Sequence, residues 1–457
     1  MEYSTLSKYV FDLIEKEAQR QEDEICLIAS ENYTSKDVMK AQGSVLTNKY
    51  AEGYVPGKNK TTGEPTYRRY YAGCEIIDKI EAYAVDKCKE LFGCKYAYVQ
   101  PHSGSQANQA VYLALCNPGD KILGMSLDEG GHLTHGAKVS SSGKIYNAIP
   151  YGIDDNGIIN YEEIKQKLKQ NPRILIVGAS AYPRAIDFKK IRELIDEHNT
   201  ELKDNFIRDE KQFMTHLSAW GEAKDADQLY EENKCYMMVD MAHIAGLIAS
   251  GLHESPIGIA DVITSTTHKT LRGPRGGIIL TNDVNIAKKI NSAVFPGLQG
   301  GPLEHVIAGK AICFEEALDP SFKDYCARIL KNMKAMEKVF KENAVDMVSD
   351  GTDNHLILLD LRKYNVSGAS LEKRLEEIGI VCNKNAVKND PKPKMKTSGV
   401  RIGSAAATTR GFTEDEFEFI AKMIVDEIKD LSENKAVSLA EKKEKVKEMC
   451  HRHPIYN

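Results

Sequence analysis

The sequence predicts an α/β protein with a mostly parallel main sheet, followed by a smaller α+β region. Strand-like apolar runs alternate with helical patterns between residues 96 and 280, and such alternation is typical of a parallel sheet covered by helices on both faces. After about residue 316 the pattern changes to long charged helices around short strands. The 457 residues, 42% of them hydrophobic, can form the cores of two or three domains.

The chain begins with a predicted helix over residues 1–24, in which an apolar stripe runs among charged residues. The stripe consists of Tyr9, Val10, Leu13 and Ile14. We expect an N-terminal arm, residues 1–45, that packs on the body of the protein or on a partner subunit. The stretches 27–33 and 46–53 are polar and lack a regular apolar period, so they suit a binding surface better than a core.

The large domain is expected over residues 46–316. Its predicted strands are 96–100, 121–125, 174–177, 236–239, 262–264 and 278–280, with helices opening near Ser105 and around Ile191. The charged segment 197–234 contains the only tryptophan, Trp220, and separates a helix from the next strand. Because such connections are normally a few residues long, we predict a surface insertion at about 197–234.

A smaller C-terminal domain is expected over residues 317–457. The sequence predicts helices at 323–342, 414–432 and 440–449, and a short strand at 356–361.

The formal net charge is -5 and no long block of Lys and Arg occurs, which argues against a nucleic-acid or anionic-membrane partner. The N-terminus has no apolar signal region and no apolar run reaches membrane-spanning length, so we expect a cytoplasmic protein. Ten scattered cysteines without a Cys-x-x-Cys pair fit reduced thiols. The pairs His132/His135 and His451/His453 lack an evident third and fourth ligand, so no metal site is expected.

Lys269 lies in a loop rich in Thr, Gly and Pro between two predicted strands. Most lysines are solvated surface charges, but His268 and four hydroxyl residues at 264–267 precede this one, and a Gly-Pro segment follows it. Such a setting can hold an amine against a flat cofactor and partly desolvate it, which lowers the pKa of the amine and makes it a Schiff-base nucleophile. The sequence therefore indicates a pyridoxal phosphate site.

Two further side chains follow predicted strands. Asp240 ends a buried strand, where its carboxylate can pair with a pyridinium nitrogen; the alternative is a cap for the next helix or turn. His132 also follows a strand and could stack on a flat cofactor, or it could be an ordinary hydrogen-bonded loop histidine.

Ser103, Gly104 and Ser105 open a predicted helix, where small residues and backbone N–H groups can surround a phosphate. The same residues could form an ordinary helix N-cap, and they lack the spacing of a Walker or dinucleotide motif. Arg401 sits in a short strand of the second domain, where its guanidinium could bind a substrate carboxylate or form a structural salt bridge.

At these residues the sequence resembles the serine hydroxymethyltransferase family, pyridoxal-phosphate enzymes with the aspartate-aminotransferase-like fold. The resemblance extends over nearly the whole chain and is most specific at 47–54, 99–108, 239–246, 266–270 with 273–277, and 295–302. It implies a large domain with a mostly parallel seven-stranded sheet and a smaller α+β C-terminal domain. It also implies reversible transfer of a hydroxymethyl group from serine to tetrahydrofolate, which gives glycine and methylenetetrahydrofolate.

The resemblance implies a role for each matching residue. Lys269 would form the Schiff base, Asp240 would pair with the pyridine nitrogen, and His132 would stack on the ring. His243 would contact the O3′ side of the cofactor. The remaining cofactor-binding positions would be Ser103, Gly104 and Ser105 at the phosphate with Gly301 of the partner subunit assisting, and Thr266, His268 and Tyr50.

For the substrates, Glu52 resembles the family's acid/base carboxylate and would also need to be near neutral at working pH. Tyr50 and Tyr71 resemble tyrosines that reach across a dimer interface, and Ser30 and Arg401 would position the substrate carboxylate. Leu127, Gly131, Leu133 and Asn385 match positions that touch the pterin. Sites shared in this way imply an obligatory homodimer, with pairing into tetramers left open.

The sequence departs from the family at three places. The link 55–67 is longer than usual, and 197–234 is an insertion. The segment after Arg401 reads Gly403-Ser-Ala-Ala406, without the family's proline, and we hypothesise a more mobile carboxylate site there.

Two alternative functions stay open at this point. A folate-independent aldolase of β-hydroxy amino acids would keep Lys269, Asp240 and Arg401 but would not need the segments of Glu52 and Asn385. A catalytically idle homologue could serve as a scaffold, although it would have no chemical reason to retain Lys269, Asp240 and Glu52 together.

Overall fold

The computed structural model describes residues 7–57, 69–213 and 225–456. Contacts within the chain divide it into two compact units. The larger unit comprises residues 37–180 and 185–319, and the smaller unit comprises 1–36, 181–184 and 320–457. The first 36 residues therefore group with the C-terminal part of the chain, whereas the sequence analysis drew its domain boundaries after residues 45 and 316.

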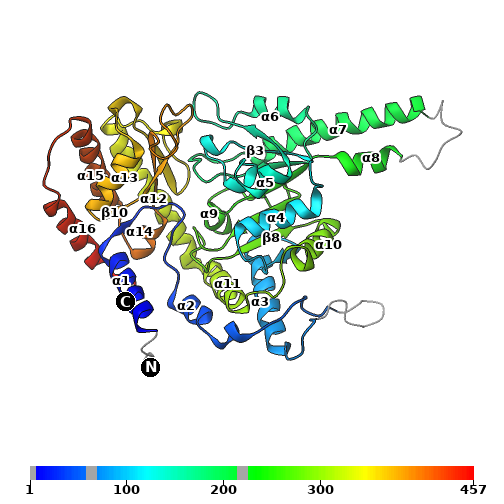
Figure 1. Cartoon of the computed structure of the whole chain (residues 1–457), viewed down its shortest axis with the longest axis horizontal. Coiled ribbons are helices and arrows are strands. Elements are labelled where there is room, and N and C mark those ends of the chain that lie inside the picture. The colour runs from blue at the N-terminus through cyan, green and yellow to red at the C-terminus, as the bar shows by residue number, and fades with distance from the viewer. Residues whose placement is uncertain (1–6, 58–68, 214–224, 457) are drawn as a thin grey trace. The chain divides into compact units, whose positions relative to one another are not determined.

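Seven strands of the described residues form one sheet in the larger unit, in the order β2-β8-β7-β6-β5-β3-β4 (Figure 1). From β7 to β4 every neighbouring pair is parallel, and β8 runs antiparallel to both β7 and β2. The strands are β2 (Tyr96–Tyr98), β3 (Lys121–Met125), β4 (Asn147–Tyr151), β5 (Ile174–Val177), β6 (Tyr236–Asp240), β7 (Val262–Thr266) and β8 (Gly277–Thr281). The predicted α/β fold with a mostly parallel seven-stranded sheet is confirmed.

Strand β5 shows why the central strands are continuous apolar runs. Ile174 and Ile176 pack in a core cluster with residues of α4 and α10, while Leu175 and Val177 point to the opposite face. All four side chains are fully buried, because both faces of the sheet are covered. The sequence analysis missed β4, an edge strand that is mostly exposed and contains Pro150, a residue tolerated at edges.

The helices that begin in or belong to the larger unit are α2 (Lys36–Gln42), α3 (Glu75–Phe92), α4 (Gly104–Leu115), α5 (Ser141–Ile145), α6 (Tyr161–Leu168), α7 (Phe188–Phe213), α8 (Ala226–Asn233), α9 (Ala245–Ala249), α10 (Val284–Ser292) and α11 (Glu304–Leu318). Two short 3₁₀ helices, Leu127–Glu129 and Leu133–His135, follow β3.

The segment expected as a surface insertion prolongs α7 and adds α8, which packs beside α7 (Figure 1). Asn199 is buried and exchanges two hydrogen bonds with the backbone of Cys235, of 2.9 and 3.0 Å. Leu202 is buried as well. The beginning of this segment therefore belongs to the core, and Trp220 lies outside the described residues.

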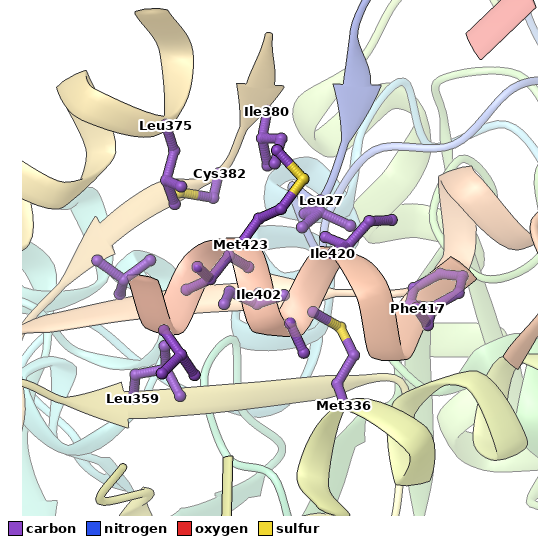
Figure 2. Close-up of a cluster of buried hydrophobic side chains, with 14 of the residues drawn as sticks. Leu27, Met336, Leu359, Leu375, Ile380, Cys382, Ile402, Phe417, Ile420 and Met423 are labelled. Carbon is purple, nitrogen blue, oxygen red and sulfur yellow. The ribbon is translucent and has the colours of Figure 1, made fainter. Parts of the chain in front are cut away.

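The smaller unit contains an antiparallel sheet in the order β11-β12-β9 and a parallel pair of β1 with β10. Figure 2 shows part of its core, in which Phe417, Ile420 and Met423 of α15 gather with Leu359 and Ile402 of the sheet. Its elements are α1 (Lys8–Asp23), β1 (Ile25–Cys26), α12 (Pro320–Glu342), β9 (Leu356–Asp360), α13 (Gly368–Glu377), β10 (Ile380–Val381), β11 (Asn383–Asn385), β12 (Gly399–Gly403), α14 (Ala405–Arg410), α15 (Glu414–Ser432) and α16 (Ala440–Arg452).

Helix α1 confirms the predicted N-terminal helix, and its C-terminal end contacts α16, where Asp23 Oδ1 lies 3.0 Å from His451 Nε2. The side chains of its apolar stripe are 44–70% exposed, and none of its residues is buried. The alternative of packing on a partner subunit stays a prediction. Among the helices described, none has the length and apolar character needed to cross a bilayer.

Candidate active site

Lys269 lies in the loop between β7 and β8, and its side chain is only 8% exposed. The backbone closes this loop at its base: Thr267 N donates to Gly276 O over 3.2 Å, and Gly273 N donates to Thr267 O over 2.7 Å. The loop is therefore a fixed turn at the sheet edge, and it holds a buried amine as the sequence analysis expected.

A second set of hydrogen bonds ties this loop to the segment that follows β6. Thr270 Oγ1 donates to His243 O over 3.0 Å and accepts from Gly246 N over 2.9 Å. A Cβ atom on Gly246 would lie 2.6 Å from Thr270 O, so the close approach requires glycine. Thr270 therefore links the loop that carries Lys269 to the segment that carries His243.

Asp240 ends β6, and its carboxylate is held by three donors. Asn108 Nδ2 lies 2.9 Å and His135 Nε2 lies 3.0 Å from Oδ2, and Ala242 N donates to Oδ1 over 3.1 Å. Burial by itself raises the pKa of Asp240, but the hydrogen bonds from His135 and Asn108, together with the charges that His135 and His132 carry when protonated, hold it well below its ordinary value. Asp240 is therefore an oriented, ionised carboxylate.

His132 is connected to Asp240 through Asn108 and Thr134. Asn108 Nδ2 also donates to Thr134 Oγ1 over 2.8 Å, and that hydroxyl lies 2.7 Å from His132 Nδ1. Burial lowers the pKa of His132 to about 4, against the opposing effect of Asp240, so the imidazole is neutral near pH 7. A neutral flat ring suits stacking on a flat cofactor. We call Lys269, Asp240, His132, His135 and Asn108 the Lys269 group.

His135 is a member of this group that the sequence analysis did not assign. Its ring lies 5.5 Å from that of His132 between centroids, and its Nδ1 is buried without a hydrogen-bond partner. Possible metal-ligand atoms of His132, His135 and Asp240 lie within 4.8 Å of one another. Asp240 is thus the third possible metal ligand that the sequence analysis did not find beside the two histidines. Because Asp240 Oδ2 already accepts from His135 and Asn108, we assign His135 to orienting the carboxylate. In the sequence, the position of His135 three residues after His132 is the signal that could have identified it as a site residue.

The predicted phosphate site lies at the N-terminus of α4. Ser103 caps the helix, with Oγ accepting from Gln106 N over 3.2 Å. A Cβ atom on Gly104 would lie 2.6 Å from Thr266 Cγ2, and the Thr266 hydroxyl is buried with no hydrogen-bond partner within residues 7–57, 69–213 and 225–456. Gly277, which the sequence analysis did not single out, lies so close that a Cβ there would be 2.3 Å from Ser103 O.

These features fit pyridoxal phosphate. An unpartnered buried hydroxyl beside a helix N-terminus and the small residue Gly104 suits a phosphate group. The Lys269 group provides a buried amine, an oriented carboxylate and a neutral imidazole. His268 Nδ1 is a further buried atom without a partner, and burial followed by the nearby cations Arg275, Lys269 and Lys310 lowers the pKa of His268 to about 3.

Glu52 belongs to a different and more open group. Tyr50 OH donates to Glu52 Oε1 over 3.1 Å, and the rings of Tyr50 and Tyr71 lie 5.0 Å apart between centroids. The hydrogen bond to Glu52 raises the pKa of Tyr50. Cβ atoms on Gly300 and Gly301 would lie 2.9 Å from Glu52 Oε1 and 3.1 Å from the Tyr50 ring. We call these five residues the Glu52 group, and Tyr50 and Tyr71 are 53% and 47% exposed.

Arg69, which the sequence analysis did not assign, clamps the backbone around Glu52. Its Nη1 donates to Ala51 O over 2.8 Å and to Gly53 O over 3.1 Å, on either side of Glu52. The guanidinium also pairs with Asp78 at 2.9 Å and with Glu81 at 2.8 Å.

A third acid, Glu304, lies beside this clamp. Its Oε1 is 3.9 Å from Arg69 Nη1, and both carboxylate oxygens are buried without a hydrogen-bond partner among the described residues. Burial, and then the charge of Glu81, raises the pKa of Glu304 to about 8 from its ordinary 4.5. Glu304 is therefore protonated at neutral pH.

Three predicted substrate residues belong to the smaller unit. Arg401 on β12 is 9% exposed, and its Nε donates to Asn383 Oδ1 over 2.9 Å. Burial lowers the pKa of Arg401 to about 10, so the guanidinium stays charged. Ser30 lies near the end of β12, because a Cβ atom on Gly403 would be 2.4 Å from Cα of the preceding residue, Ala29. Asn385 lies on β11, which pairs with β12.

The segment after Arg401 is not a mobile loop. Ser404 is fully buried, its Oγ donates to Ile329 O over 3.0 Å, and α14 begins at Ala405. Ala405 and Ala406 are 2% and 1% exposed. Tertiary packing therefore holds this segment without a proline, which argues against the hypothesis of a more mobile carboxylate site.

The other predicted folate contacts follow β3 in the larger unit. Leu127 and Leu133 are 37% and 47% exposed, which leaves apolar surface for a flat ring. Gly131 packs so tightly that a Cβ would lie 2.1 Å from Met125 O, so the turn requires glycine.

The family model described as serine hydroxymethyltransferase matches residues 4–207 and 210–424. The chain is 51% identical to serine hydroxymethyltransferase 2 of Pseudomonas fluorescens strain Pf0-1, over 99% of this chain and 98% of that protein. It is 50% identical to serine hydroxymethyltransferase 2 of Pseudomonas putida, with the same coverage of both chains.

Proposed function

The chain belongs to the serine hydroxymethyltransferase family, and from this premise we propose how its own residues carry out the family's reaction. The reaction is the reversible transfer of a hydroxymethyl group from L-serine to tetrahydrofolate, which gives glycine and 5,10-methylenetetrahydrofolate. The observation that carries the proposal is the ionised Asp240 carboxylate, oriented by Asn108 and His135 and connected to the ring of His132. A carboxylate so held is what a pyridinium nitrogen requires.

Pyridoxal phosphate, when bound, supplies a ring that accepts the electron pair of the broken Cα–Cβ bond of serine. Lys269 would bind its aldehyde, Asp240 would keep a proton on the ring nitrogen, and His132 would lie on the ring face. His243 would contact the hydroxyl side of the ring. The other residues proposed to hold the cofactor are Ser103, Gly104, Ser105, Thr266, His268, Tyr50 and Gly301.

For the amino acid, we propose that Arg401 binds the carboxylate as a bidentate partner, with Ser30 assisting. Glu52 would carry the proton at the serine hydroxyl and the folate, and its hydrogen bond from Tyr50 fixes the carboxylate at one oxygen. Tyr71 would border the same site. Leu127, Gly131, Leu133 and Asn385 would contact the pterin of tetrahydrofolate.

We also propose a cytoplasmic homodimer in which each site uses residues of both subunits. The half-exposed tyrosines of the Glu52 group support this assembly, because large apolar rings at such exposure suit an interface. Small molecules would be the only substrates, without nucleic acid or membrane.

The test is a visible absorbance spectrum of the purified protein alone, with glycine, and with glycine plus tetrahydrofolate. We expect a band of bound aldehyde that shifts to longer wavelength only when both glycine and tetrahydrofolate are present. A glycine response that ignores folate would support the aldolase alternative. A protein that never binds the aldehyde would support the scaffold alternative.

A further inference from the structure

Lys310 is a buried cation in α11, and its side chain is 1% exposed. Its Nζ donates to three backbone carbonyls: Val99 O at 2.6 Å, Pro101 O at 3.0 Å and Gly277 O at 2.8 Å. A lysine ammonium has three N–H donors, so these three bonds use all of them. The charge is therefore held by peptide dipoles rather than by a carboxylate.

The three carbonyls belong to the backbone that leads into the phosphate site. Pro101 lies two residues before Ser103, and its oxygen also accepts from Gly277 N over 2.9 Å. Gly277 in turn packs directly on Ser103, where a Cβ would be 2.3 Å from the carbonyl oxygen. Lys310 thus fastens the chain after β2 to the start of β8 at the point where Ser103 caps α4.

The space for Lys310 comes from a glycine. A Cβ atom on Gly276 would lie 2.3 Å from Lys310 Cε and 2.8 Å from Nζ. The two consecutive glycines therefore leave space for different groups. Gly276 leaves space for the side chain of Lys310, and Gly277 leaves space for Ser103, the N-cap of α4.

The charge of Lys310 acts on two histidines next to predicted cofactor-binding residues. After burial, it is the next cause that lowers the pKa of His102, which precedes Ser103. It also contributes to the lowered pKa of His268, which precedes Lys269.

Among the described residues, three of the titratable groups that face Lys310 are buried and two are partly buried. They are Cys88 and Glu81 of α3 and Cys313 of α11, besides His102 and His268. Burial lowers the pKa of Lys310 to about 7. Since a neutral amine has two N–H donors, loss of the proton would release one of the three carbonyls.

We propose that Lys310 is a positioning residue for the phosphate end of the cofactor site. Its ammonium holds the backbone around Ser103 and Gly277 in place and puts a buried positive charge behind it, without contacting the phosphate. This inference rests on the proposed function, because it assumes that the Ser103 site binds the phosphate of pyridoxal phosphate.

The experiment compares wild-type protein, Lys310→Met and the exposed control Lys288→Met on α10, all freed of bound aldehyde. Each is titrated with pyridoxal phosphate, with inorganic phosphate, and with pyridoxal, which lacks the phosphate. We expect Lys310→Met to bind pyridoxal phosphate and inorganic phosphate about tenfold or more weakly than wild type, as the loss of charge-assisted bonds predicts. Its affinity for pyridoxal should stay within about twofold of wild type. Lys288→Met should match wild type throughout.

A pH series adds a readout that a merely structural role would not move. In wild type, the preference for pyridoxal phosphate over pyridoxal should fall as the pH rises above about 7, where Lys310 loses its proton. In Lys310→Arg, which keeps its charge, the preference should stay constant over the same range.

Two results would overturn the inference: phosphate binding by Lys310→Met equal to that of wild type, or an equal loss for pyridoxal and pyridoxal phosphate. If circular dichroism shows that Lys310→Met is unfolded, the Lys310→Arg series decides, and a wild-type decline with pH in that variant contradicts the inference. Failure of wild-type protein to bind any of the aldehydes would instead refute the proposed function.

Discussion

The Lys269 group and the Glu52 group lie in the same unit but are built in opposite ways. In the first, Lys269 is buried and Asp240 has donors on both carboxylate oxygens. In the second, Tyr50 and Tyr71 are about half exposed and Glu52 has one hydrogen bond from a side chain of its own group. The chain alone thus holds the side chains of the first group in place, whereas the second still has surface that another molecule can cover.

The buried titratable residues behind the two groups, Lys310 and Glu304, also differ in whether their hydrogen bonds are satisfied. Lys310, behind the Ser103 site, has all of its donors satisfied by carbonyls. Glu304, behind the backbone of Glu52, has no hydrogen-bond partner in the described part of the chain and keeps a proton instead. An unsatisfied buried acid makes the support of the Glu52 group sensitive to pH.

The largest expected effect comes from separating the two groups. Lys269→Ala and Glu52→Gln proteins should each lack hydroxymethyl transfer when pure. After unfolding and refolding together in equal amounts, about a quarter of wild-type activity should return, because half of the dimers are mixed and each mixed dimer has one intact site. Activity assays before and after mixing measure this, and no recovery in dimers shown to be mixed would mean that both groups serve the same subunit's site.

Asp240→Asn should break the Lys269 group from within. The amide keeps the shape of the side chain but removes the charge that a protonated ring nitrogen needs, so turnover should fall by about a hundredfold or more. The exposed control Asp227→Asn, which only loses an ion pair with Lys203, should keep wild-type turnover. Steady-state kinetics with both variants decide the point, and a loss of less than about fivefold would exclude a role for the Asp240 charge.

Glu304→Gln tests whether the buried acid behind the backbone of Glu52 makes the stability of the protein depend on pH. Folded protein keeps the Glu304 proton up to about pH 8, whereas the unfolded chain releases it near 4.5, so wild-type stability falls as the pH rises between these values. Because glutamine does not titrate, the variant should gain roughly 2–4 kcal/mol of stability relative to wild type over that interval. Denaturant unfolding at several pH values measures the difference, with exposed Glu315→Gln on α11 as control. A difference that does not change with pH would contradict the buried acid.

The smallest effects come from one chemical change made in both regions. Tyr112→Phe removes the buried donor to Thr134 O, at 2.8 Å, and should cost about 1–3 kcal/mol of unfolding free energy. Tyr50→Phe removes the half-exposed donor to Glu52 and should change stability by less than about 0.5 kcal/mol. Denaturant unfolding of the two proteins compares them, and equal losses would show that the regions do not differ in packing.

The parts that sequence reasoning found have local signals. β3 and β5 are short apolar runs whose predicted bounds match the structure, and Asp240 and His132 follow strands as expected. Strand β4 was missed because an exposed edge strand needs no apolar pattern.

The parts that it missed depend on distant partners. His135 acts on Asp240, 105 residues away, and Lys310 donates to Val99, 211 residues away. In the sequence Lys310 is an ordinary lysine of a helix. The same limit applies to the segment after Arg401, since the burial of Ser404 and Ala405 and the hydrogen bond from Ser404 Oγ to Ile329 O cannot be inferred from the absence of a proline.

The sequence by itself determined the order of the elements and the residue types at the strand ends, because period and turn chemistry are local properties of the chain. It also determined the family, through motifs that contain the reactive amine and carboxylate. Only the tertiary structure decided which buried charges are satisfied. The reason is that the pKa of Asp240, Glu304 or Lys310 depends on burial and on hydrogen-bond partners that folding brings from other segments.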